Sequence, residues 1–277
     1  MKNYFTLDED FGTIIQNALP NTTIYGMKSV TTGWTNIVYE VNTVKGDFFF
    51  RFPRDDFWAR TIVKDYEFAK FIYGKTDFNT VKLTLLYDHG RPFSMHKKIE
   101  GTVLADKIND LTPEEIAVVS NDIAKFLFQL HNLQFDKNAV FETKEIGLNL
   151  VHFLDELLEV HVDPKDKVFW HSEDLNKKEK NCLVHGDFNS SNVLLDENNH
   201  VSGIIDFGFA GFGNKYDDIA RILSRSYPEN FKNEMIHQYE NFCKAPLDTP
   251  ILDHEIKTWT NIDHAYINYM RGIGIYE

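Results

Sequence analysis

The sequence has little of what marks a secreted, membrane-spanning or metal-stapled protein. Two cysteines among 277 residues are too few and too scattered for a disulfide framework or a zinc site. No apolar run approaches the roughly 20 residues that a membrane span needs, and the N-terminus lacks the apolar stretch of a signal peptide. We therefore expect a cytoplasmic protein that has no membrane partner.

Positive charge is also scarce, since 29 Lys and Arg residues stand against 42 Asp and Glu residues and the formal net charge is −13. Binding of a nucleic-acid backbone needs a basic face, so no nucleic-acid partner is expected. A cationic small molecule would be attracted to such a chain, although net charge by itself mainly aids solubility. Internal repeats and low-complexity segments are absent, and a hydrophobic content of 43% is enough for one large core or two lobes.

The chemically informative stretch runs from residue 183 to residue 208. Two apolar strands flank a turn at residues 198–199, and their pairing as a hairpin brings Asp187, Asn192 and Asp206 to one end. Two carboxylates and an amide oxygen suit a hard cation such as the Mg²⁺ that accompanies nucleotide phosphates. In phosphoryl transfer such a loop Asp orients and deprotonates the acceptor hydroxyl, while the Asn and the second Asp hold metal. The pattern predicts Asp187 as the catalytic residue and Asn192 and Asp206 as metal ligands; the alternative is a hairpin with solvated turn carboxylates.

Three features of this stretch also occur together in a known family: His-Gly-Asp at 185–187, Asn192 five positions after that Asp, and Asp-Phe-Gly at 206–208. They resemble the aminoglycoside phosphotransferase and choline kinase family, which has a protein-kinase-like fold. The resemblance extends from about Thr22 to Ala220. It is closest to the branch that acts on the 2″-hydroxyl of aminoglycosides, in the segments 48–53 (FFFRFP) and 96–101 (HKKIEG).

The resemblance implies an α+β, two-lobed fold. Residues 1–98 would form an N-terminal nucleotide-binding lobe with an antiparallel β-sheet and helices, and residues 99–277 a mainly helical C-terminal lobe for catalysis and substrate binding. The nucleotide would be ATP or GTP with Mg²⁺.

Two segments of the first lobe are expected to contact this nucleotide. A loop over residues 31–36 interrupts two predicted strands, and its backbone N–H groups and the hydroxyl of Thr35 could donate to phosphate oxygens. We assign Gly33, Thr35 and Asn36 to this loop, although an ordinary hairpin loop has the same composition. By the resemblance, the backbone of Lys98 and Ile99 forms the hinge that recognises the purine.

The strand over residues 48–52 carries Arg51 among phenylalanines, where kinase-like folds place a Lys that neutralises the phosphates. A charge in such a strand needs a partner, and Glu67 on the predicted helix from about residue 56 to residue 73 is the candidate. An Arg fork does not reproduce the point charge of a Lys. Arg54 or Lys64 therefore remain alternative sources of the phosphate-binding charge.

Two capping boxes predict helix starts, one from Thr6 to Glu9 and one from Thr112 to Glu115. The second opens a helix that runs to about residue 133. Further helices are expected over residues 146–160, 229–242 and 251–271, as is one that begins near Asp217 and Asp218. These two carboxylates either cap that helix or, as in the family, brace the catalytic loop.

By the resemblance, the acceptor pocket is lined by residues 146–181 and 250–271, whose carboxylates would bind ammonium groups; a solvated charged face is the plainer interpretation. The leading hypothesis is a monomeric, Mg²⁺-dependent kinase that phosphorylates a hydroxyl of an aminoglycoside-type antibiotic, and thereby confers resistance, or of a related cationic amino-sugar. The alternatives are a kinase of a macrolide or of a choline-like or sugar-like metabolite, and a regulatory pseudokinase, because the Lys expected at position 51 is missing.

Overall fold

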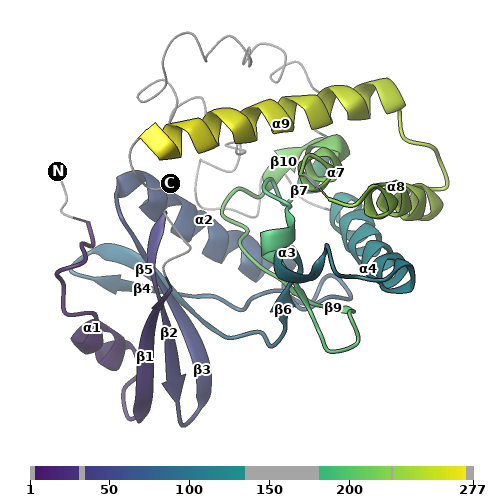
Figure 1. Cartoon of the computed structure of the whole chain (residues 1–277). Coiled ribbons are helices and arrows are strands. Elements are labelled where there is room, and N and C mark those ends of the chain that lie inside the picture. The colour runs from purple at the N-terminus through teal and green to yellow at the C-terminus, as the bar shows by residue number, and fades with distance from the viewer. Residues whose placement is uncertain (1–3, 31–34, 135–180, 226, 273–277) are drawn as a thin grey trace.

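The computed structural model describes residues 4–30, 35–134, 181–225 and 227–272, and the side chains of the last helix up to residue 264. Three of our predictions lie wholly or mostly outside the described residues: a phosphate contact at Gly33, a helix over residues 146–160, and the part of the acceptor pocket assigned to residues 146–181. The described residues form a smaller lobe built on a sheet and a larger, mainly helical lobe (Figure 1).

The smaller lobe is a five-stranded antiparallel sheet with the strand order β1-β2-β3-β5-β4. Its strands are β1 (Ile24–Val30), β2 (Asn36–Thr43), β3 (Gly46–Pro53), β4 (Thr84–Asp88) and β5 (Arg91–Lys97). Helix α1 (Phe11–Ala18) covers the sheet, and its Phe11 and Ile15 share a small core with Val41, Phe50 and Phe52. The alternation of β3 therefore turns Phe50 and Phe52 to this core and Arg51 to the opposite face.

Helix α2 (Asp56–Ile72) lies between the sheet and the larger lobe (Figure 1). Four of its buried side chains, Trp58, Phe68, Ala69 and Ile72, belong to the core of the larger lobe. The ring of Phe68 stacks on that of Phe207, with 5.8 Å between the centroids. The helix thus connects the sheet to the loop that follows residue 205.

The larger lobe combines helices with short strands. Its described elements are β6 (Thr102–Val103), α3 (Leu104–Lys107), α4 (Pro113–His131), β7 (Cys182–Val184), a 3₁₀ turn η2 (Ser190–Asn192), β8 (Val193–Leu195), β9 (Val201–Ile204), β10 (Gly211–Gly213), α7 (Lys215–Leu223), α8 (Glu229–Cys243) and α9 (Thr249–Gly272). Helix α4 packs against α8, and the long helix α9 lies across α7 (Figure 1). None of the described helices has the length and apolar character that crossing a membrane requires.

The α+β, two-lobed arrangement is the one expected from the sequence. The hairpin of β8 and β9 is confirmed, with Val193 opposite Ile204. The capping box of Thr112 and Glu115 opens α4 as predicted. The other capping box does not open a helix, because α1 begins at Phe11 with Asp10 as its N-cap.

Candidate active site

The predicted catalytic loop, residues 185–192, lies between β7, which pairs with β10, and β8, which pairs with β9. Asn189 Nδ2 donates to both the backbone oxygen and Oδ1 of Asp187, each at 3.1 Å. Asn192 Nδ2 donates to the same backbone oxygen at 3.0 Å. Two amides from the loop therefore fix the residue expected to act on the acceptor.

A buried carboxylate holds the loop from below. Asp218, on α7, accepts the backbone N–H groups of His185 and Gly186, both at 2.8 Å, and lies 3.2 Å from His131 Nε2. The cap of α7 is instead supplied by Asn214, in a capping box with Asp217. The sequence left two roles open for these acids, capping of α7 and support of the loop. Asp217 takes part in the cap, and Asp218 is the brace that binds the loop backbone.

Asp206 stands at the end of the hairpin beside Asn192, because the backbone N–H of Ile205 donates to the backbone oxygen of Asn192 at 3.0 Å. Its φ of +66° is in the left-handed region, which few residues with side chains adopt. His185 Nε2 donates to the carbonyl of Ile205 at 3.0 Å and supports this turn. Burial alone would raise the pKa of the Asp206 carboxyl, but Arg51 and His185 lower it below its ordinary value.

Arg51 connects the sheet to this carboxylate. Its Nη1 lies 2.5 Å from Asp65 Oδ2 and its Nη2 3.2 Å from Asp206 Oδ1. Burial would lower the pKa of Arg51, but the two carboxylates raise it above its ordinary value, so the guanidinium stays charged. Arg54, one alternative source of this charge, is exposed, and Lys64 is buried on α2. Arg51 is thus a cation in direct contact with Asp206.

The prediction that Arg51 pairs with Glu67 is wrong, since the acid that meets it on α2 is Asp65. Two residues of a helix differ by about 200° in direction, so Asp65 and Glu67 point to opposite sides. Asp65 is fully buried, whereas Glu67 is half-buried. The sequence carries a signal that identifies Asp65: it lies on the apolar stripe of α2 between Ile62 and Ala69, where an acid needs a partner.

The remaining residues predicted to contact the nucleotide are Lys98, Ile99, Thr35 and Asn36. The backbone N–H of Lys98 donates to the Asp47 carbonyl at 2.8 Å and its Nζ to Glu40 at 2.7 Å, so neither group is free for a purine. Recognition of a purine by the backbone of Lys98 stays a prediction. Asn36 is buried and donates to the Thr35 hydroxyl at 2.9 Å. Contacts of Thr35, Asn36 and Ile99 with a nucleotide stay predictions.

The donor atoms at the hairpin end fit Mg²⁺ that arrives with a nucleotide. No group of three or more His, Cys, Asp and Glu side chains within the described ranges is placed to hold a metal on its own. Mg²⁺ commonly takes one or two protein ligands and completes its shell with water and phosphates. The side chain of Asp206 is 40% exposed, and Asn192 uses its amide nitrogen on Asp187, which leaves its Oδ1 as the ligand atom.

A second arginine, whose role the sequence pattern did not predict, contacts Asp187 in the predicted catalytic loop. Arg221, on α7, donates from Nε to Asp187 Oδ1 at 2.7 Å and from Nη1 to both carboxylate oxygens of Asp263 at 2.9 Å. Burial would lower its pKa, but the two carboxylates raise it. The available signal was a lone charge in the apolar run from Ile219 to Leu223.

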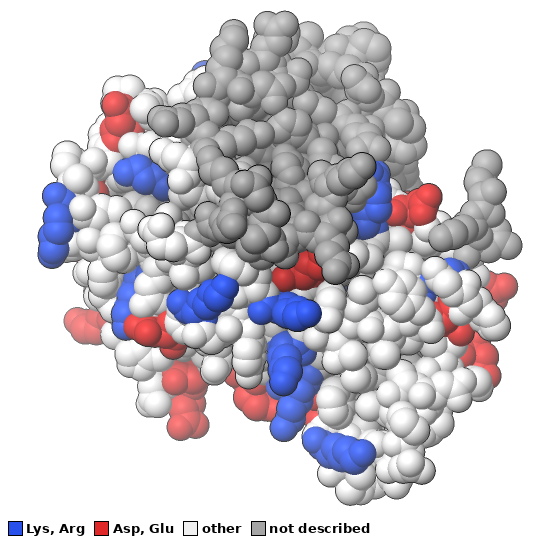
Figure 2. All heavy atoms as spheres, turned by 180° about the vertical axis from the view of Figure 1, so that it is seen from behind, with Lys and Arg blue, Asp and Glu red and all other residues white. Residues whose placement is uncertain are grey.

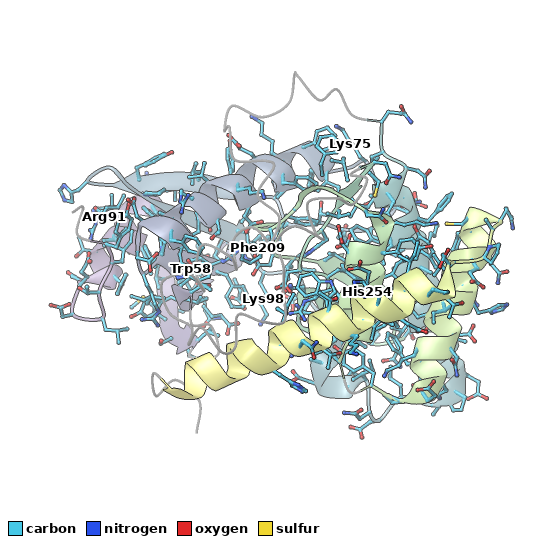
Figure 3. All side chains as sticks on the ribbon, turned by 90° about the horizontal axis from the view of Figure 1, so that it is seen from above. Trp58, Lys75, Arg91, Lys98, Phe209 and His254 are labelled. Carbon is cyan, nitrogen blue, oxygen red and sulfur yellow. The ribbon has the colours of Figure 1, made fainter. Side chains whose placement is uncertain are left out.

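The ion pair of Arg51 and Asp206 joins the sheet of the smaller lobe to the larger lobe. Seen from above, Trp58, Phe209 and Lys98 lie in the central part of the molecule, whereas Arg91 lies at the outer end of the sheet (Figure 3). The view from behind shows Lys and Arg side chains as well as acidic ones beside the undescribed residues (Figure 2).

Comparison with known proteins places this geometry in context. The sequence model of a family described as a phosphotransferase enzyme family matches residues 26–248. Among solved structures, the GDP and kanamycin complex of an APH(2″) enzyme is similar with a TM-score of 0.72 and 21% identity, over 95% of this chain and 93% of that one. An ADP-bound aminoglycoside phosphotransferase, APH(2″)-Ib, gives 0.65 and 19%, over 98% and 93%. The apoenzyme of a macrolide 2′-phosphotransferase from Brachybacterium faecium gives 0.64 and 14%, over 96% and 94%.

Proposed function

The chain belongs to the phosphotransferase enzyme family and is a small-molecule kinase, and from this premise we propose that it transfers the γ-phosphate of ATP or GTP, with Mg²⁺, to a hydroxyl of a cationic small molecule. An aminoglycoside-type antibiotic or a related amino-sugar is the favoured acceptor. One observation carries the proposal: Arg51 contacts Asp206, and Asp206 stands beside the loop that holds Asp187. A phosphate-binding cation, a metal ligand and a catalytic carboxylate are then available to one nucleotide.

Each of these residues has a distinct part in the proposed reaction. Asp187 orients the acceptor hydroxyl and receives its proton. Asn192 and Asp206 would hold Mg²⁺, which supplies charge neutralisation at the phosphates when it is bound. Arg51 stabilises the negative charge of the phosphates. Residues 1–98 would bind the nucleotide, and residues 99–277 would bind the acceptor and carry the catalytic loop.

The choice of acceptor rests on similarity of fold and on charge. Solved structures with this fold include complexes with GDP and kanamycin, with ADP, and with ATP and streptomycin, which supports a nucleotide and an amino-sugar here. A macrolide remains the second candidate, since a macrolide phosphotransferase has the same fold. A choline-like or sugar-like metabolite uses the same chemistry. The chain would act as a cytoplasmic monomer.

The proposal is tested by release of nucleoside diphosphate from ATP and from GTP, each with Mg²⁺, across aminoglycosides, macrolides, choline and simple amino-sugars. Asp187→Asn is measured beside the wild type. Release that an acceptor stimulates, and that the variant lacks, supports the kinase and identifies the acceptor class. Thermal stabilisation by nucleotide without transfer to any acceptor would contradict it and favour a nucleotide-binding regulator.

A further inference from the structure

The side chain of Asp187 is held on one oxygen and open on the other. Oδ1 accepts from Arg221 Nε at 2.7 Å and from Asn189 Nδ2 at 3.1 Å. Among the described residues, no side chain or backbone group donates to Oδ2, and the side chain keeps 22% of its surface exposed. The two donors therefore set the direction of the carboxylate and leave Oδ2 for the acceptor hydroxyl.

The side chain of Arg221 is buried and held by contacts with α9. Its side chain is 6% exposed, and its Nη1 contacts both oxygens of Asp263 on α9. Its guanidinium lies 5.0 Å from the ring centroid of Trp259, which is one helical turn from Asp263 on the same helix. A planar guanidinium can make these contacts at once, whereas the single ammonium of a Lys cannot.

Helix α7 presents Asp218 and Arg221 one turn apart, so both reach the same loop. Asp218 binds the backbone of that loop, and Arg221 binds the catalytic side chain. We propose that Arg221 is a positioning residue for phosphoryl transfer, which orients Oδ2 of Asp187 toward the acceptor. Because Asp263 holds Arg221, this orientation also depends on how α9 packs against α7. The inference rests on the proposed function of Asp187.

The test compares Arg221→Lys, Arg221→Gln and Arg221→Ala with Arg225→Gln. Arg225 is the matched control, because it lies 3.0 Å from the same Asp263 carboxylate but has no contact with Asp187 in the described part of the chain. We expect a kcat about 100-fold lower for the Arg221 variants, the size of effect that a misplaced catalytic group produces. The KM values for nucleotide and acceptor should change less than about threefold, and Arg225→Gln should keep the wild-type kcat.

A second readout separates positioning from a loss of folding. Free methylguanidinium at a non-denaturing concentration should restore part of the kcat of Arg221→Ala, whereas a potassium salt of equal ionic strength should not. Thermal unfolding of each variant shows whether it is folded, and Asp263→Asn should reproduce part of the kcat loss.

Four results would overturn the positioning role: an unchanged kcat in folded Arg221 variants, a loss confined to the KM of the acceptor, an equal loss in Arg225→Gln, or failure of all three Arg221 variants to fold. A wild type that shows no Asp187-dependent transfer would overturn the proposed function and the positioning role together. That result is distinguishable from the other four, since in them the wild type is active.

Discussion

The carboxylate of Asp65 on α2 accepts the backbone N–H of Phe207 at 2.9 Å, and its other oxygen meets Arg51. One fully buried acid thus links a helix, a strand of the sheet and the turn that carries Asp206. Burial raises the pKa of this carboxyl, and its contacts with Arg51 and Phe207 oppose that rise. The geometry of the turn that carries Asp206 therefore depends on a side chain that faces the protein interior.

Removing the charge of Asp65 is expected to destabilise the fold. Asp65→Asn leaves the guanidinium of Arg51 without one of its two carboxylate partners, and we expect the free energy of unfolding to fall by about 3 kcal/mol. The matched control is Glu67→Gln on the same helix, which should change stability by less than about 1 kcal/mol. Denaturant unfolding of both variants measures the difference, and equal losses would contradict the assignment of Asp65.

We expect nucleotide affinity to depend on the planar guanidinium of Arg51 and not only on its positive charge. Arg51→Lys keeps the charge but cannot contact Asp65 and Asp206 in the same way. We expect nucleotide affinity to fall about tenfold, or roughly 1.4 kcal/mol. Isothermal titration with ATP and GTP checks this, and Arg54→Lys serves as an exposed control. An unchanged affinity would show that Arg51 does not contact the phosphates.

The contacts of Asp218 with the loop backbone predict that its substitution lowers both the stability of the fold and kcat. In Asp218→Asn one of the two backbone N–H groups of His185 and Gly186 loses its acceptor and the other keeps only a neutral amide oxygen, which should cost about 2–3 kcal/mol and lower kcat. Asp217→Asn should weaken the helix cap, by about 1 kcal/mol, and leave the two loop N–H groups bound to Asp218. Steady-state rates and thermal unfolding separate the two variants. A normal kcat in Asp218→Asn would contradict the role of the brace.

Gly186 is predicted to tolerate no side chain. Its φ is +83°, and a Cβ there would lie 2.1 Å from the carbonyl oxygen of Phe209. Gly186→Ala should therefore cost about 3 kcal/mol or more. Gly74 has a similar φ of +73° with nothing within 4 Å, so Gly74→Ala isolates the backbone cost of about 1 kcal/mol. Similar unfolding midpoints for the two variants would rule out the clash.

His96 gives a prediction for pH. Burial lowers its pKa to about 4, and Arg51 also lowers it, against a hydrogen bond with Lys97. As the pH falls below about 6.5, the unfolded chain takes up a proton that the folded chain does not, so stability is lost between about pH 6.5 and 4. His96→Gln should reduce the loss of stability between pH 7 and pH 5. Parallel pH profiles for wild type and variant would contradict this.

The sequence predicted those features that depend on local pattern. The β8–β9 hairpin followed from two apolar strands around a turn, and it brings Asn192 beside Asp206 as expected. The start of α4 followed from the capping box at Thr112. At Thr6 a similar pattern forms a turn, and Asp10 caps the helix instead, because several acids compete for one cap and only packing of the apolar face selects among them.

Contacts between distant segments were harder to predict. The partner of Arg51 depends on the rotation of α2 against the sheet, which is set by the burial of Ile62 and Ala69. The contact between Arg221 and Asp187 depends on how α7 docks on the loop. In both cases a charge in an apolar stretch showed that a partner must exist, but the sequence did not show which one.

Helix α2 is part of the smaller lobe by chain position, yet four of its buried residues (Trp58, Phe68, Ala69 and Ile72) lie in the core of the larger lobe, while the sheet and α1 have a separate core. Cooperative opening follows cores rather than chain order. Amide hydrogens of α2 should therefore exchange with solvent together with those of α4, and those of the sheet should exchange as a different unit. The ion pair of Arg51 on β3 and Asp65 on α2 links these two units, so a partial unfolding that separates them must break it.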